Sequence, residues 1–268
     1  MSLRFCVLAS GSKGNATYIE GDGGAILVDA GLSARELQRR MAMAELDPGE
    51  IQAVVLTHEH GDHCRGVRVL ARRLGVPVLA TPKTWAQVQD KKGVAFEPIQ
   101  AGQALEYCGL HLQPFSVSHD AADPIGLTIG CGGARLGLCT DLGVATKLVQ
   151  TRLGGCHALI LEANHDPEML SQGPYPPWLK QRVRSRVGHL SNHDSAQLLT
   201  ELMHVGLGQV VLAHLSETNN FPELARRAAE GVVRWAGLNT RVEVAAQGEP
   251  TPVLEVEPRG RAFAEALN

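Results

Sequence analysis

The chain has 268 residues, 44% of them hydrophobic, so it can bury a sizeable core, which we expect to be a single domain over residues 1–268. Its formal net charge of -3 argues against a protein that coats nucleic acid with a basic surface, so any such binding needs a local patch. No apolar run approaches the roughly 20 residues of a membrane span. The six cysteines form no C-x-x-C pair, which is typical of a reduced, cytoplasmic protein.

Three short apolar stretches open the chain, at residues 4 to 9, 16 to 20 and 25 to 29. Gly-rich turns separate them, so they predict three antiparallel strands. The first is too short for the apolar part of a signal peptide. The turn at residues 10 to 15 is either a backbone nest for an anion or a plain hairpin turn. A helix with Ser33 and Glu36 in capping-box positions is expected over residues 33 to 46.

The rest of the chain alternates between predicted strands and helices. Helical apolar spacing predicts helices at residues 64 to 74, 84 to 89, 191 to 204 and 222 to 236. Apolar runs predict strands at residues 53 to 56, 76 to 80, 94 to 99, 110 to 117, 125 to 129, 134 to 139, 158 to 161 and 209 to 213. Residues 173 to 178 predict a Pro-rich aromatic loop, and residues 240 to 257 a terminal hairpin.

A histidine-rich loop, Thr57-His58-Glu59-His60-Gly61-Asp62-His63, directly follows the predicted strand at residues 53 to 56. Residues two apart in an extended segment point the same way, so we expect His58, His60 and Asp62 to converge. Imidazoles with one carboxylate suit zinc, with manganese or iron as alternatives. The competing interpretation is a solvated polar loop, but three histidines and an aspartate rarely coincide at this spacing.

Three further candidate ligands follow predicted strands at other places in the chain. They are His119, Asp141 and His214. Rigid strands present such side chains at a common sheet edge. Each residue taken alone could be a satisfied structural residue, but together with the histidine-rich loop they indicate a metal site.

The order His58-x-His60-x-Asp62-His63, then His119, Asp141 and His214, with Asp29 upstream, resembles the metallo-β-lactamase superfamily over almost the whole chain. This resemblance implies an α/β fold, a four-layer αββα sandwich with two metal ions at one sheet edge. It implies a first ion held by His58, His60 and His119. It implies a second held by Asp62, His63 and His214, with Asp141 bridging the two. Asp29 is then expected to support the ligand loop.

Asp141 in the bridging position is similar to ribonuclease Z, glyoxalase II and the nuclease branches, whereas a β-lactamase usually has Cys there. Segments 161–166 and 188–192 resemble ribonuclease Z motifs, and we expect Glu162 to support the ligands. Leu161 departs from that pattern, because ribonuclease Z has His before this Glu. Together with segments 8–17 and 118–124, these motifs look most like the WalJ/YycJ group of nucleases, which degrade DNA from 5′ ends.

The resemblance therefore implies a binuclear phosphodiesterase that acts on nucleic acid, DNA in preference to RNA, as a 5′ to 3′ exonuclease. A water shared by the ions would attack phosphorus. Asp141 would hold the ions together and Asp62 would orient the water. His165 or His189 would protonate the leaving oxygen or support a ligand. The alternatives are an RNA-directed nuclease, or a small-molecule hydrolase such as a glyoxalase II-like thioesterase or a cyclic phosphodiesterase.

A basic run lies between Glu168 and Asp194, where the chain has no acidic residue. We expect this run and the helix start after it to bind phosphates, although a solvated helix face is the other interpretation. The expected phosphate-binding residues are Lys180, Arg182, Arg184, Arg186, Ser191 and Asn192. Tyr175 and Trp178 either stack on an unpaired base or pin the Pro-rich loop, and we favour the second.

Overall fold

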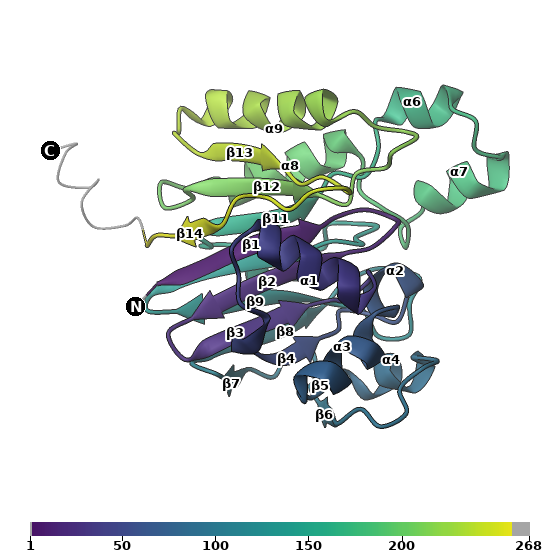
Figure 1. Cartoon of the computed structure of the whole chain (residues 1–268). Helices are drawn as coiled ribbons and strands as arrows, with labels where there is room; N and C mark the ends of the chain where they lie inside the picture. The colour runs from purple at the N-terminus through teal and green to yellow at the C-terminus, as the bar shows by residue number, and fades with distance from the viewer. Residues whose placement is uncertain (1, 259–268) are drawn as a thin grey trace, which may run out of the picture.

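In the computed structural model, which describes residues 2–258, two seven-stranded sheets lie face to face (Figure 1). The first sheet runs in the order β14 (Leu254–Val256), β1 (Leu3–Ala9), β2 (Ala16–Gly21), β3 (Gly24–Val28), β4 (Ile51–Val55), β5 (Val78–Ala80) and β6 (Phe96–Pro98). The second runs in the order β13 (Arg241–Val244), β12 (Gln209–Ala213), β11 (Ala158–Glu162), β10 (Ala134–Cys139), β9 (Ile125–Cys131), β8 (Leu110–Ser116) and β7 (Leu105–Tyr107). The sequence-predicted strands are confirmed within a few residues at their ends.

Alternate residues of a strand supply two different cores. In β1, Phe5 and Val7 point into the core between the sheets, whereas Cys6 and Leu8 point to the outer face. This follows from the two-residue period of a strand, and it requires both faces of β1 to be apolar. The apolar runs therefore mark strands buried on both sides.

Helices cover the outer face of each sheet. Helices α1 (Ala34–Met43), α3 (Val67–Leu74) and α4 (Pro82–Gln87) pack on the first sheet, and α5 (Lys147–Leu153), α8 (Asn192–Leu202) and α9 (Pro222–Ala236) pack on the second. This arrangement confirms the expected αββα sandwich. Three short helices, α2 (Gly61–Cys64), α6 (Pro167–Gln172) and α7 (Pro177–Val183), lie in connections, and Pro48–Glu50 forms a 3-10 turn. None of the described helices is long and apolar enough to cross a membrane.

The helix expected over residues 64 to 74 is interrupted, which is a correction to the sequence prediction. Helix α2 ends at Cys64 and α3 begins at Val67. Between them, the Gly66 amide donates to Ala30 O at 2.7 Å. A Cβ at Gly66 would lie 1.9 Å from Leu32 O. The chain therefore changes direction at the one residue that can pass so close to a neighbouring backbone.

The terminal hairpin expected over residues 240 to 257 is wrong. Strand β13 pairs in parallel with β12, whereas β14 pairs antiparallel with β1 in the other sheet. Pro250 and Pro252 lie between the two strands and lack the N–H that a hairpin ladder needs. The chain therefore crosses from one sheet to the other.

The Pro-rich loop expected at residues 173 to 178 is partly helical. Pro177 occupies the first turn of α7, where its missing N–H leaves no hydrogen bond unmade. Helices α6 and α7 extend beyond the ends of the sheets, at the right of Figure 1. They place the segment between β11 and α8 beside the edge of the sandwich where the histidine-rich loop lies.

Candidate metal centre

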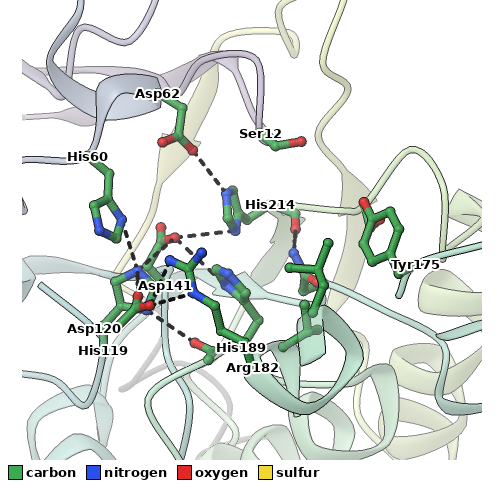
Figure 2. Close-up of a pocket in the computed structure, with 15 residues that line it drawn as sticks. Ser12, His60, Asp62, His119, Asp120, Asp141, Tyr175, Arg182, His189 and His214 are labelled. Carbon is green, nitrogen blue, oxygen red and sulfur yellow. Dashed lines mark hydrogen bonds and ion pairs between the residues drawn. The ribbon is translucent and has the colours of Figure 1, made fainter. Parts of the chain in front are cut away.

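All seven residues that resemble family ligands meet at one edge of the sandwich. Each follows the end of a strand: the histidine-rich loop follows β4, His119 follows β8, Asp141 follows β10 and His214 follows β12. Figure 2 shows His60, Asp62, His119, Asp141 and His214 around one cavity. Strand ends from both sheets therefore supply one site.

The first cluster consists of three imidazoles whose nitrogens face one another. His58 Nε2 lies 3.1 Å from His60 Nδ1, which lies 3.3 Å from His119 Nε2. Two nitrogens bound to one tetrahedral zinc at about 2.0–2.1 Å stand roughly 3.3 Å apart. The remaining nitrogen of His119, Nδ1, lies 3.2 Å from Gly188 O and can donate to it. His119 Nε2 is thus left with its lone pair towards the centre.

The second cluster adds carboxylates. Asp62 Oδ2 lies 3.6 Å from both His63 Nε2 and His214 Nε2. Asp141 reaches both clusters, with Oδ2 3.2 Å from His63 Nε2 and Oδ1 3.7 Å from His119 Nε2. Among the described residues, these neighbours do not form a well-aligned hydrogen bond with the buried atoms His214 Nε2 and Asp141 Oδ2. Buried orphan atoms of this kind are costly unless a cation pairs with them, so the donor set fits divalent ions.

The simple alternation that we expected for His58, His60 and Asp62 does not describe the loop. His60 is the N-cap of α2 and Asp62 lies in its first turn. His58 and His60 therefore meet His119, whereas Asp62 meets His63 and His214. The start of a helix in mid-motif is what divides the ligands between two clusters.

Asp29 supports the loop without joining either cluster. Its carboxylate accepts hydrogen bonds from the Thr57 amide at 2.9 Å and the Thr57 hydroxyl at 2.8 Å. It also lies 2.8 Å from His63 Nδ1, which directs His63 Nε2 to the centre. The backbone of Asp29 has a left-handed φ of 62°, and Asp141 and His214 do too, at 56° and 58°. Such conformations cost energy in residues other than Gly, and they aim these side chains.

Glu162 is a fully buried carboxylate that accepts five hydrogen bonds. The Nδ1 atoms of His189 and His214 each lie 2.9 Å from its Oε1. The backbone amides of Asp141, Leu142 and Leu190 also donate to it. Burial raises the pKa of Glu162, but the charges and hydrogen bonds of His189 and His214 outweigh burial and lower it to about 2. Glu162 therefore stays ionised and orients both imidazoles.

The cavity above the clusters has a volume of about 270 Å³. Its lining residues are Ser12, His60, Asp62, His119, Asp120, Asp141, Asn164, Tyr175, Leu179, Arg182, Val183, Gly188, His189, His214 and Ser216. The two candidate proton donors are placed differently. His189 borders the cavity. His165 is buried and does not line the cavity, and no described residue forms a hydrogen bond with His165 Nδ1.

The six residues expected to bind phosphates do not lie together. Arg182 borders the cavity, whereas Arg184 and Arg186 line a separate pocket. Lys180 Nζ donates to Ser171 O within its own segment. The last two are buried: Ser191 forms a capping box with Asp194 at the start of α8, and Asn192 bonds Asn220.

The turn at residues 10 to 15 uses its amides within the protein. The Gly11 amide donates to Asn15 Oδ1, and the Lys13 amide donates to Gln247 Oε1. Asn15 Nδ2 lies 3.0 Å from His63 Nε2. These contacts favour a structural turn that rests on the ligand loop over an anion nest.

Comparison with known proteins agrees with this geometry. A family model described as "Beta-lactamase superfamily domain" matches residues 25–215. The chain belongs to the metallo-β-lactamase superfamily. Within this superfamily, it is 35% identical to "Exodeoxyribonuclease YycJ" of Bacillus anthracis, over 97% of each chain. It is 32% identical to "Exodeoxyribonuclease WalJ" of Streptococcus pneumoniae D39, over 96% of this chain and 99% of that one.

Solved structures show the same superfamily fold. The metallo-beta-lactamase fold protein YhfI from Bacillus subtilis superposes with a TM-score of 0.72 at 16% identity, covering 95% of this chain and 100% of that one. Human tRNase Z, short form, superposes with a TM-score of 0.64 at 15% identity, covering 95% and 100%. At sequence identities this low, the superposition shows a shared fold and nothing about function.

Metal binding should stabilise the chain. Adding Zn²⁺ or Mn²⁺ to metal-free protein at about 100 times Kd is expected to raise the free energy of unfolding by about 2.7 kcal/mol. That corresponds to an increase in Tm of about 5–11 °C, measured by calorimetry. The His60→Ala variant should lose most of this increase. A Tm unaffected by metal would contradict the assignment of the ligands.

Proposed function

We propose that the protein is a binuclear metal-dependent exonuclease that hydrolyses DNA phosphodiester bonds in the 5′ to 3′ direction. The observation that carries the proposal is Asp141, whose two oxygens face the two ligand clusters below an open cavity. The two relatives named as exodeoxyribonucleases, similar over nearly their whole length, support a DNA substrate. The polarity rests on the resemblance to the WalJ/YycJ group.

The ligand roles follow the two clusters. His58, His60 and His119 would hold one ion and Asp62, His63 and His214 the other, with Asp141 between them. Zinc or manganese suits these donors, and iron is the alternative. Bound there, two divalent ions would lower the pKa of a water molecule and would stabilise both the attacking and the leaving oxygen of a phosphodiester.

Asp62 and Asp141 differ in how far their side chains are exposed to solvent, and we assign them different roles on that basis. The Asp62 side chain is 21% exposed and borders the cavity, whereas that of Asp141 is 4% exposed. We therefore propose that Asp62 orients the attacking water and accepts its proton. Asp141 would hold the two ligand clusters together, since its two oxygens face one cluster each.

We assign His189 the role of the general acid that protonates the leaving oxygen. Its Nδ1 is held by Glu162, which leaves Nε2 for the cavity that His189 borders. His189→Gln is expected to lower kcat on DNA by about 10²- to 10⁴-fold. It should change bis-p-nitrophenyl phosphate hydrolysis much less, because nitrophenolate leaves without a proton. The same substitution at His165, outside the cavity lining, is expected to change DNA kcat far less. An equal loss at both positions would contradict the assignment.

The function itself is tested with end-labelled single- and double-stranded DNA and RNA, incubated with zinc, manganese or magnesium. We expect mononucleotides to be released from the 5′ end of DNA. Internal fragments would indicate an endonuclease, and preferred RNA cleavage an RNA-directed enzyme. Turnover of bis-p-nitrophenyl phosphate without cleavage of any nucleic acid would indicate a small-molecule hydrolase instead.

A further inference from the structure

One wall of the cavity differs chemically from the rest. Among the residues that line the cavity, the only apolar side chains are those of Tyr175, Leu179 and Val183. All three come from the segment that leads into and forms α7. Figure 2 shows Tyr175 across the cavity from His60. Binding a phosphodiester at a metal centre requires only polar groups. The apolar wall is therefore suited to contact a less polar part of the substrate.

The same wall carries one fixed cation. Arg182 Nε and Nη2 each lie 2.7 Å from Asp120 Oδ2, across 62 positions of sequence. Asp120 also lies beside a ligand, with Oδ1 3.3 Å from His119 Nε2. A guanidinium has five N–H donors, and this carboxylate engages two of them. The other three remain at the cavity rim, on a side chain whose orientation Asp120 sets.

Neighbouring residues of the same kinds are placed elsewhere. Trp178, one residue before Leu179, is 65% exposed and does not line the cavity. Arg184, two residues after Arg182, lines a separate pocket with Gly143 and Asp194. The segment therefore presents one aromatic ring and one guanidinium to the metal side.

We propose that the α7 wall is a nucleotide subsite beside the metal centre, in which Tyr175 stacks on an unpaired base and Arg182 binds a phosphate of the same strand. This inference rests on the proposed function, because it assumes a nucleic-acid substrate. Asp120 is a positioning residue that acts through Arg182. A stacked base must be unpaired, so the subsite receives a single strand or a frayed duplex end.

The stacking contact is tested with single-stranded oligonucleotides that carry an abasic residue beside the cleaved bond. Stacking on an aromatic ring is worth about 5- to 150-fold in kcat/KM. Tyr175→Ala should lose this factor on normal DNA and lose nothing further on the abasic oligonucleotide. Tyr175→Phe should restore it, since the ring is kept. Trp178→Ala is the matched control, with activity expected to stay within about twofold.

The phosphate contact is tested by KM and its salt dependence. Arg182→Ala should raise KM for single-stranded DNA about 10- to 150-fold, the usual loss for a hydrogen bond to a charged group. It should also reduce the slope of log KM against log salt by about 0.7, one phosphate contact. Metal content should not change, and bis-p-nitrophenyl phosphate turnover should fall much less than DNA cleavage. Arg227→Ala, an exposed arginine on α9, is the charge-matched control.

Asp120→Asn distinguishes positioning from folding. It should raise KM less than Arg182→Ala, and the KM of the double variant should match that of Arg182→Ala within about twofold, because Asp120 affects phosphate binding through that side chain. An effect of Asp120 through its contact with His119 would appear in metal content and in bis-p-nitrophenyl phosphate turnover, which are measured on the same variants. Additive losses, an unchanged salt slope, or equal losses for Tyr175→Ala and Trp178→Ala would each overturn the subsite. Wild-type protein that cleaves no nucleic acid would overturn the proposed function instead, so the two failures remain distinct.

Discussion

Asp141→Asn is expected to lower hydrolysis by on the order of 10³-fold, because the several kcal/mol that a pair of ions would supply depends on the carboxylate that we propose to lie between them. Asparagine is the informative substitution, since it tolerates the left-handed φ of 56° that position 141 adopts. Alanine would add backbone strain to the lost ligand. Metal content measured by plasma emission should fall with activity on both DNA and bis-p-nitrophenyl phosphate.

The control for Asp141→Asn is Asp166→Asn, another carboxylate that follows a strand of the second sheet. Asp166 caps α6 by accepting from the Glu168 and Met169 amides and does not border the cavity. Asparagine keeps that capping role, so activity and metal content should stay close to wild type. Full activity of Asp141→Asn with normal metal content would contradict a bridging role.

Glu162→Gln is expected to destabilise the metal-free protein and to weaken metal binding. A buried charged partner that is removed typically costs about 3–5 kcal/mol, and here glutamine would also turn an N–H group towards existing donors. The Tm should fall by about 6–20 °C. Since His214 would lose the carboxylate that orients it, metal affinity should fall about 10- to 100-fold. Calorimetry and competition with a chelator measure the two effects separately.

Glu36→Gln is a matched control, because the pKa of Glu36 is also lowered to about 2, here by hydrogen bonds from Arg39 and Arg40. Glu36 lies on the surface of α1 with a side chain 32% exposed, so solvent screens these pairs. Its loss should cost less than about 1 kcal/mol. Similar effects at both positions would mean that burial and the imidazole contacts of Glu162 contribute little.

The sequence predicted best the elements that a local pattern determines. After Gln209, strand β12 is an uninterrupted apolar run, and α9 lies between Pro222 in its first turn and the left-handed Gly237 at its end. Helix α7 was missed because its prolines resemble a loop. The partner of β14 could not be predicted, because its pairing with β1 joins opposite ends of the chain.

In the candidate site too, features set by a local pattern could be predicted and contacts between distant parts of the chain could not. The ligand positions were expected from a compact motif and from residues that follow strands. The pairing of Arg182 with Asp120 spans 62 positions, and no spacing rule indicates it. The separation of Arg182 from Arg184 depends on where α7 ends, which composition does not reveal. A run of like charges therefore could not be divided into the member that borders the cavity and those that lie elsewhere.

The short outer strands limit how the sheets could pair edge to edge with another molecule. Strands β14, β6 and β7 have three residues and β13 has four, and these four strands form the margins of the two sheets. Short margins offer few free backbone groups for another molecule to extend. A chain cut before Leu254 would leave the seven-residue apolar strand β1 uncovered. Such a fragment is expected to aggregate through β1.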